Sequence, residues 1–358
     1  MIKYTIRRLI QAIPTFFGIT MLSYLLMTAA PGGPTAALAF DPRISPQERR
    51  AIEARLGVSD PWPVQYLRWL TGDDWMRRDT TGDGRADTCI LIPCDADGDG
   101  QMEPAGTRRG ILRLDFGTSF FERRPVLEVI GDRVNATFEL GLSALVVSLI
   151  IGIPLGILAG VYRGSLFDNI ARLVSVVFSA VPIFWLGLIL LLIFGRWLDI
   201  LPLGGRHGIV LTGEVPPLYS RLNYLILPTF VLAANYIAVY TRYMRASLLD
   251  VINQDYVRTA QAKGLSGTRV WFIHTARNAL IPIATFLGPA ITGILGGAVL
   301  TETIFSWPGL GRTGVSAVIQ QDYPVVMAVV IIGAAATILG YIVSDVMYAI
   351  IDPRIRFD

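Results

Sequence analysis

Residues 137–161 read TFELGLSALVVSLIIGIPLGILAGV, and this stretch decides the fold class. Glu139 is its one charged residue. At a rise of about 1.5 Å per residue, a helix of this length crosses an apolar layer of about 30 Å. Apolar runs of about 18 residues or more are typical of membrane spans. The segment therefore predicts a transmembrane helix.

Five other segments share this character. The chain has 358 residues, of which 53% are hydrophobic and only 16% charged, whereas a soluble domain carries about 25% charged residues. The other long apolar runs cover residues 9–30, 173–197, 225–243, 280–300 and 325–351. The run at 225–243 is the least uniform, because Asn235, Tyr236 and Tyr240 interrupt it. We predict an all-α polytopic membrane protein with six transmembrane helices.

The first apolar run could instead be a secretory signal, because basic residues precede it. Its apolar stretch exceeds the roughly 7–15 residues of a signal core. Pro31 also follows the point where cleavage would occur. We therefore expect a retained span.

Glycine and proline recur inside these runs, in IGIPLGILAG at 151–160 and at Pro182 with Gly187. In membrane helices such residues permit close packing and kinks. In a transporter the same kinks would let a span rock. We expect close helix packing at 151–160 and a kink at Pro182.

Basic residues are distributed unevenly between the loops. With the N-terminus placed inside, the inside segments hold Lys3, Arg7, Arg8, Arg163, Arg172, Arg242, Arg245, Arg258, Lys263, Arg269, Arg277, Arg354 and Arg356. The short outside loops hold only Arg196, Arg206, Arg221 and Arg312. Because cytoplasmic loops carry the excess of Lys and Arg, we expect both termini to be cytoplasmic.

This orientation divides the chain into four expected parts. They are a cytoplasmic N-terminus with the first span (1–30), a large extracytoplasmic loop (31–134), five spans (135–351) and a cytoplasmic tail (352–358). The outer loop contains an Asp-rich insertion at about 75–113, and a polar loop at about 247–279 lies on the cytoplasmic side.

The polar loop contains YVRTAQAKGLSGTRVWF at 256–272. Gly264 suits the left-handed residue that ends a helix, and Ser266 or Thr268 could cap a following one. The first helix has a small apolar face formed by Ala260, Ala262 and Leu265. Such a projection could be gripped by a soluble partner, or it could be an amphipathic connector lying on the membrane surface.

Motifs along nearly the whole chain carry a family resemblance. YVRTAQAKGLS is followed by RNALIP, and the other motifs are YTIRRLIQAIPTFFGITMLSYLL, RLGVSDPWPVQYLRWL, DFGTSFFERRPVLEVI, ATFELGLSAL, IGIPLGILAGVYRGSLFD, SAVPIFWLGLILLLIF, TETIFSWPGLGRTGVSAVIQQDYPVV and DPRIRFD. In this order they resemble the binding-protein-dependent ABC importer permeases, and most closely the B-type subunit of the dipeptide/oligopeptide/nickel family. The general permease pattern has Glu-Ala-Ala where this chain has Arg258, Thr259 and Ala260. The missing glutamate resembles the peptide-family variant.

The resemblance implies a fold and a function. The fold would be the six-helix type I ABC importer kind, in a bacterial or archaeal plasma membrane. The polar loop would be a coupling loop whose helix docks on a cytoplasmic ATPase through Arg258, Thr259, Ala260, Gln261, Ala262, Lys263, Gly264, Leu265 and Ser266. Implied partners are a second permease of C type, two ATPase subunits, an extracytoplasmic binding protein and membrane lipid. Short peptides would be the substrate, although nickel, glutathione and oligosaccharides use the same scaffold.

Other function classes are less well supported by the sequence. No GxxxxGK[ST] phosphate loop is present, so ATP would be bound only by partners and the chain itself would not be an enzyme. The net charge of +3 gives no indication of a nucleic-acid partner. A secondary carrier using Glu139 and Asp345 for ion coupling is the main alternative, but it would be favoured by an inverted repeat, which we do not find.

The Asp-rich insertion suggests calcium. It contains DTTGDGRADTCILIPCDADGDGQME, in which two copies place acidic residues at alternating positions with a glycine for the turn. The candidate ligands are Asp79, Asp83, Asp87, Asp95, Asp97, Asp99 and Glu103, and the pair resembles the calcium repeats of thrombospondin type 3 or dockerin modules. A flexible acidic loop is the alternative. Cys89 and Cys94 flank the bridge between the copies, where a disulfide is plausible outside the membrane. No cofactor is expected in the transport domain.

Overall fold

The computed structural model describes residues 2–29, 53, 60–79, 85–91, 93–94, 102, 104, 106, 109–208, 216–283, 286, 290 and 298–351. These residues are mainly helical, and the β-bridges among them include Arg78–Thr88 and Thr118–Pro125. The chain divides into two compact units. Unit 1 comprises Met1–Ile13, Arg133–Thr313 and Ile332–Asp358, and unit 2 comprises Pro14–Asp132 and Gly314–Ile331.

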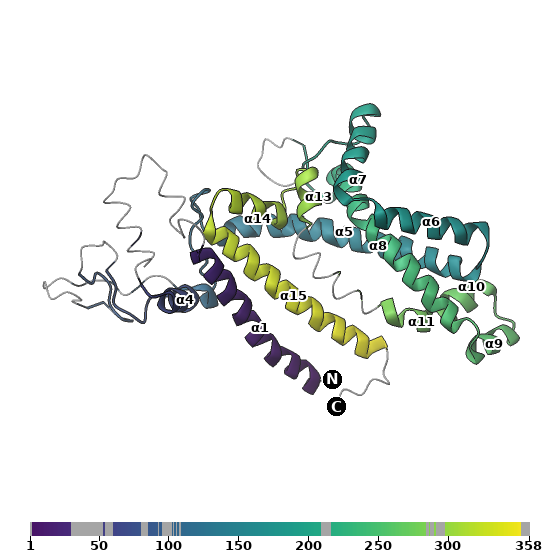
Figure 1. The fold of residues 1–358 in the computed structure, drawn as a ribbon, viewed down its shortest axis with the longest axis horizontal. Helices are drawn as coiled ribbons and strands as arrows, with labels where there is room; N and C mark the ends of the chain where they lie inside the picture. The colour runs from purple at the N-terminus through teal and green to yellow at the C-terminus, as the bar shows by residue number, and fades with distance from the viewer. Residues whose placement is uncertain are drawn as a thin grey trace. The chain divides into compact units, whose positions relative to one another are not determined.

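Figure 1 labels most of the helices. The long ones are α1 (Ile2–Ala29), α5 (Val126–Val161), α8 (Leu218–Val251) and α15 (Tyr323–Ile351). The shorter α-helices are α4 (Trp62–Thr71), α6 (Leu166–Ala180), α7 (Ile183–Leu190), α9 (Asp255–Ala262), α10 (Gly267–Arg269), α11 (Ala276–Ala279), α13 (Val299–Ile304) and α14 (Leu310–Ile319). A 3₁₀ turn, η2 (Ile111–Arg113), and two π-helical segments, η3 (Leu191–Trp197) and η4 (Val270–Thr275), complete the described elements.

Four of these helices are long and apolar enough to cross a membrane: Ile6–Ala29 of α1, α5, Tyr219–Val251 of α8 and Tyr323–Ser344 of α15. The bent pair formed by α6 and α7–η3 gives a fifth if it is one span. The span predicted at 280–300 lies largely outside the described residues. The helical membrane class is therefore confirmed, and the count of six stays a prediction.

The predicted kink at Pro182 is a complete break. Ala180 ends α6, Val181 is extended (φ −75°, ψ 125°), and the next helix turns by 102°. The physical cause is that proline lacks an N–H and keeps the preceding residue out of the helical region. The helix also starts earlier than the predicted 173, because the hydroxyl of Ser165 accepts a capping hydrogen bond from the N–H of Asp168 (3.3 Å).

Close packing at 151–160 is confirmed by the contacts of three glycines, Gly152, Gly156 and Gly160, along α5. A Cβ added to Gly156 would lie 2.6 Å from Cβ of Met244 and 2.7 Å from the carbonyl oxygen of Thr241. Gly152 and Gly160 lie one turn before and one turn after Gly156. A Cβ added to Gly152 would lie 2.9 Å from Cβ of Tyr240, and one added to Gly160 would lie 2.7 Å from Cδ2 of Leu248. Because glycine has no side chain, the α5 and α8 backbones can come this close. We call this contact the glycine seam.

A salt bridge ties α6 to the same helix. Arg245 of α8 binds Asp168 through two hydrogen bonds, Nε to Oδ1 at 2.6 Å and Nη2 to Oδ2 at 2.8 Å. The Asp168 side chain is 1% exposed. Bidentate arginine–carboxylate pairs fix geometry as well as charge, so α5, α6 and α8 form one packed group in unit 1 (Figure 1).

Candidate functional site

The turn after α9 has a defined helix-ending geometry. Gly264 has φ +74°. Its N–H donates to the carbonyl of Gln261 (2.9 Å), and the N–H of Leu265 donates to the carbonyl of Ala260 (3.4 Å). These two bonds define a Schellman motif. The predicted left-handed role of Gly264 is confirmed.

One face of α9 packs inward against the following segment. Val257 and Ala260 are buried and contact Val270, with Leu265 and Trp271 partly buried beside them. We call this group the turn cluster. The prediction that Ala260, Ala262 and Leu265 form one small apolar face is wrong, because the three side chains do not lie on the same side. Ala260 is 6% exposed because Val270 covers it, and Leu265 is half-buried, while Ala262 faces outward.

The other predicted docking residues are exposed. Arg258, Thr259, Gln261, Ala262, Lys263, Gly264 and Ser266 all present their side chains or backbone to the outside of the chain. Of these, Arg258 has an ion-pair contact of 3.9 Å with Asp255. Because both side chains are exposed, this contact contributes little to stability. The turn is a polar, basic projection supported from beneath by the turn cluster.

The segment after the turn connects it to the membrane helices. Ser266 occupies the position before α10, but its side chain makes no capping hydrogen bond. η4 follows α10 directly, and the hydroxyl of Thr275 donates to the carbonyl of Val270 (2.9 Å). α11 then packs on α8, where Ala276 and Ala279 join Met244 and Leu248 in a buried cluster.

Glu139 lies in a charged cluster that the sequence did not reveal. One of its oxygens, Oε2, accepts hydrogen bonds from Arg206 (Nε 2.8 Å, Nη2 2.5 Å) and from Arg221 (Nη1 2.7 Å). The three side chains are 9–11% exposed. Two arginines of the same chain therefore pair with the Glu139 carboxylate. The side chain of Asp345, the other residue considered for ion coupling, lies outside what the structure describes.

Glu302 is a second buried carboxylate, and it caps the start of α14. Its Oε1 accepts from the hydroxyl of Thr137 (3.0 Å) and its Oε2 from the N–H of Arg312 (2.8 Å). Thr137 in turn accepts from the N–H of Leu310 (2.7 Å). Gly309 leaves room for the carboxylate, since an added Cβ would lie 2.3 Å from Oε1. Burial raises the pKa of Glu302, and these hydrogen bonds oppose that rise.

Nothing near Glu302 in the sequence predicts this role, and its segment, TETIFSWPGLG, carries only the family resemblance. The N–H of the Trp307 indole also donates to the carbonyl of Ala136 (2.8 Å). The motif therefore anchors the α13–α14 turn to α5.

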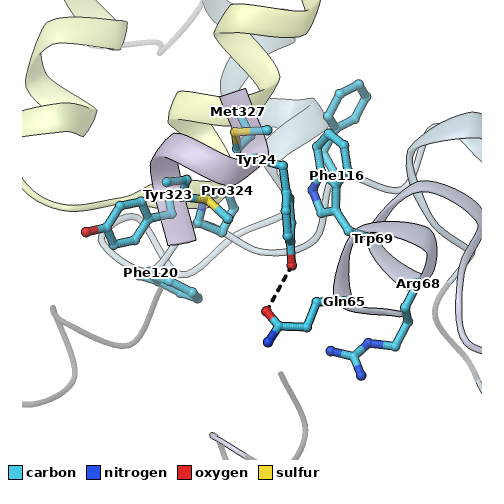
Figure 2. Close-up of a pocket in the computed structure, with 10 residues that line it drawn as sticks. Tyr24, Gln65, Arg68, Trp69, Phe116, Phe120, Tyr323, Pro324 and Met327 are labelled. Atoms are coloured by element: carbon cyan, nitrogen blue, oxygen red, sulfur yellow. Dashed lines mark hydrogen bonds between the residues drawn. The ribbon is translucent and has the colours of Figure 1, made fainter. Parts of the chain in front are cut away.

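Unit 2 contains a small cavity walled by aromatic side chains (Figure 2). Tyr24 of α1 and Trp69 of α4 lie beside it, with ring centroids 5.3 Å apart. The Tyr24 hydroxyl points to Gln65 Oε1 (3.5 Å). The wall that carries Phe120 is held by Asp322, whose carboxylate accepts from Phe120 N–H (3.1 Å) and Ser119 Oγ (2.5 Å). Several of the family motifs contain lining residues of this cavity, but the sequence does not predict that they meet.

The predicted calcium ligands are mostly beyond the described part of the chain. Asp83, Asp95, Asp97, Asp99 and Glu103 lie outside it. Asp79 and Asp87 are described and flank the Arg78–Thr88 bridge, where the N–H of Asp87 donates to the carbonyl of Arg78 (2.8 Å). Among the described residues no group of three potential metal ligands occurs.

The two cysteines are joined. Cys89 and Cys94 form a disulfide with a Cα–Cα distance of 5.7 Å. Cys89 is fully buried and hydrogen-bonds to Pro104 and Gly106 through its backbone. The disulfide joins two residues five positions apart, within the Asp-rich insertion.

Comparison with known proteins assigns the family. Residues 152–357 match the model of the binding-protein-dependent transport system inner membrane component, and residues 1–95 match its N-terminal counterpart. The oligopeptide transport system permease protein AppB of Bacillus subtilis (strain 168) is 38% identical over 358 residues, which is 100% of both chains. The dipeptide permease DppB of Escherichia coli (strain K12) is 35% identical, and the di/tripeptide permease DppB of Pseudomonas aeruginosa (strain UCBPP-PA14) is 36% identical, each over 99% of both chains.

Among solved structures, the MetNI methionine ABC transporter in an inward-facing conformation has a chain with 14% identity and a TM-score of 0.46. That match covers 63% of this chain and 97% of the other. The similarity is too low to compare positions residue by residue. The family match rests on the sequence comparisons, which cover more than half of the chain by the family model and all of it by the relatives. The chain is an integral membrane transport permease, and it belongs to the family of binding-protein-dependent transport system inner membrane components.

Proposed function

We propose that the chain is a permease subunit of an ATP-driven ABC importer and forms half of the translocation pathway for short peptides. The observation that carries this proposal is its full-length similarity to permeases named for oligopeptide and dipeptide transport. A binding protein outside the membrane would deliver the peptide. Nickel, glutathione or oligosaccharides are the alternative substrates, and uptake assays with each of them would distinguish these cases.

The proposed complex contains a second permease of C type, two ATPase subunits and the binding protein. The sequence has no GxxxxGK[ST] loop, so the partners would bind and hydrolyse ATP. This chain would contribute no catalytic residue. It would act as a non-catalytic subunit that changes conformation when its partners do.

The exposed turn after α9 is the proposed docking surface. Ala262 and Lys263 lie at its tip, and the exposed backbone of Gly264 offers close approach to a partner. Ala260 and Leu265 support it from inside the turn cluster. When ATP closes the ATPase pair, two such turns would move together. The attached helices would tilt, and the pathway would open to the outside.

The proposed topology places this turn and both termini in the cytoplasm, with six spans and the loop at 31–134 outside. The distribution of Arg and Lys supports this orientation. Tyr162, in the expected cytoplasmic loop between α5 and α6, is 57% exposed and lies outside the proposed docking surface. A Tyr162→Cys variant should react with a membrane-impermeant maleimide in inverted vesicles and stay unlabelled in intact cells. Labelling in intact cells would refute the proposed orientation.

Copurification tests the assembly. A tagged chain extracted in mild detergent from its own host should bring two ATPases and a second permease. The variant Ala262→Trp should lose the ATPases but keep the second permease, because the change is confined to the exposed turn. Ala246→Trp, at an exposed alanine of α8, is the matched control and should retain all partners. A chain that purifies alone and stable would refute the importer assignment.

Calcium binding by the Asp-rich insertion stays a separate proposal. The spacing of Asp95, Asp97 and Asp99 supports it. Extracellular calcium modules bind with a Kd of about 10⁻⁴–10⁻³ M, so calcium outside the cell in this range would occupy such a site. CaCl₂ should raise the melting temperature of the full chain more than MgCl₂ does, and Asp97→Asn should remove the difference. Equal shifts with both salts in the unchanged chain would reject a calcium site.

A further inference from the structure

Tyr240 carries a buried hydroxyl without a hydrogen-bond partner in the part of the chain that the structure describes. It lies in the C-terminal half of α8 and is 1% exposed. Its ring packs among apolar side chains that include Ile157, Met244 and Ile283. The hydroxyl oxygen has no hydrogen-bond partner among the described residues. Buried polar atoms are nearly always paired, so this one needs an explanation.

Tyr240 is part of a tyrosine face on α8. Tyr236 and Tyr243 lie four residues before it and three after it, on the same side of the helix. The rings of Tyr236 and Tyr240 stack with centroids 6.3 Å apart. Tyr236 is half-buried and Tyr243 is 45% exposed. These residues include two of the three that interrupt the apolar run at 225–243.

Phenylalanine would fill the same space at Tyr240 without leaving a polar atom unpaired. An unsatisfied hydroxyl destabilises the state in which it is buried. A protein that alternates between two conformations can retain such a group if the other conformation satisfies it. Polar groups inside membrane spans commonly mark the path of a transported molecule.

We propose that the tyrosine face of α8 contacts the cargo, and that the Tyr240 hydroxyl hydrogen-bonds the main chain of a passing peptide when the helices rearrange. The inference rests on the proposed function as a peptide importer. A tyrosine hydroxyl can donate and accept, and every peptide presents both N–H and C=O groups. Tyrosine rings also contact varied side chains with little loss of conformational entropy. The face therefore suits recognition that tolerates many peptide sequences.

The test uses Tyr240→Phe in the complete importer in its own host. The matched control is Tyr219→Phe, which removes a hydroxyl from a 78% exposed position of the same helix. Uptake is measured with radiolabelled Ala–Ala and Phe–Ala, and stability by the melting temperature of the purified complex. Tyr240→Phe should lower uptake of both peptides by a similar factor, about 3- to 10-fold for one lost hydrogen bond. Its melting temperature should equal or exceed that of the unchanged complex, and Tyr219→Phe should change neither quantity.

Three outcomes would overturn the inference. Unchanged uptake with Tyr240→Phe would show that the hydroxyl does not meet the cargo. Loss of uptake together with a lower melting temperature would show that the hydroxyl supports the fold instead. If the unchanged importer takes up neither peptide, the proposed function itself fails and this inference with it.

Discussion

The glycine seam between α5 and α8 allows a stability prediction with a magnitude. In Gly156→Ala the new Cβ would meet Cβ of Met244 at 2.6 Å and the carbonyl oxygen of Thr241 at 2.7 Å. Both distances are well below ordinary contact, and one of the atoms belongs to the backbone. Overpacking of this kind costs about 1–3 kcal/mol. The better helix propensity of alanine offsets about 0.5–1 kcal/mol of that cost.

The matched control is Gly333→Ala in α15. A Cβ added there has no heavy atom within 4 Å, so the control should show only the propensity gain of about 0.5–1 kcal/mol. The difference between the two variants isolates the packing cost of about 1–3 kcal/mol. Gly160→Ala should cost less than Gly156→Ala, because its closest contact is the flexible end of Leu248 (Cδ2, 2.7 Å).

The assay is the melting temperature of the full chain in detergent, followed by size-exclusion chromatography after heating. At about 2–4 °C per kcal/mol, Gly156→Ala should melt about 2–12 °C below Gly333→Ala. If Gly156→Ala melts at or above the control, the two helices do not touch at Gly156 and the seam is misplaced.

Two further predictions concern the buried carboxylates. Gly309→Ala would place a Cβ 2.3–2.6 Å from the Glu302 carboxyl atoms, so it should lower stability by about 1–3 kcal/mol; an unchanged melting temperature would contradict the capping role of Glu302. Glu139→Ala leaves the buried Arg221 and the largely buried Arg206 without their shared carboxylate and should lower stability by about 3–5 kcal/mol. Replacing all three of these residues with apolar side chains should restore much of the loss, and an equal loss in the single and triple variants would refute the charge argument.

Sequence reasoning recovered those features that depend on local properties of the chain. Apolar runs gave the long helices, Pro182 gave the break between α6 and α7, and Gly264 gave the end of α9, because each effect acts within a few residues. The sequence did not predict contacts between side chains that are far apart along the chain. Glu139 meets its arginines 67 and 82 positions away, and Glu302 meets its threonine 165 positions away. The fold alone brings such pairs together.

The error at Ala260 has a different cause. In a helix of eight residues, small and apolar side chains lie on two sides, and the sequence does not say which side meets the rest of the protein. Val270, which lies ten positions later, packs in the same buried cluster as Ala260, and so the Ala260 side of the helix faces inward. The exposed surface of the turn is therefore more polar and basic than the sequence analysis predicted, with Ala262 as its small outward residue.

These corrections give the turn a direct mechanical connection to the membrane helices. The turn cluster includes Trp271, and Trp271 also packs on the cluster that contains Ala276 and Met244. Met244 is the residue that Gly156 of α5 accommodates. A continuous series of packed side chains thus runs from the exposed turn to the glycine seam. Because packed interiors deform little, a displacement of the turn by a partner would move α8 and α5 together rather than slide one past the other, and the seam that stabilises the fold would also transmit the motion.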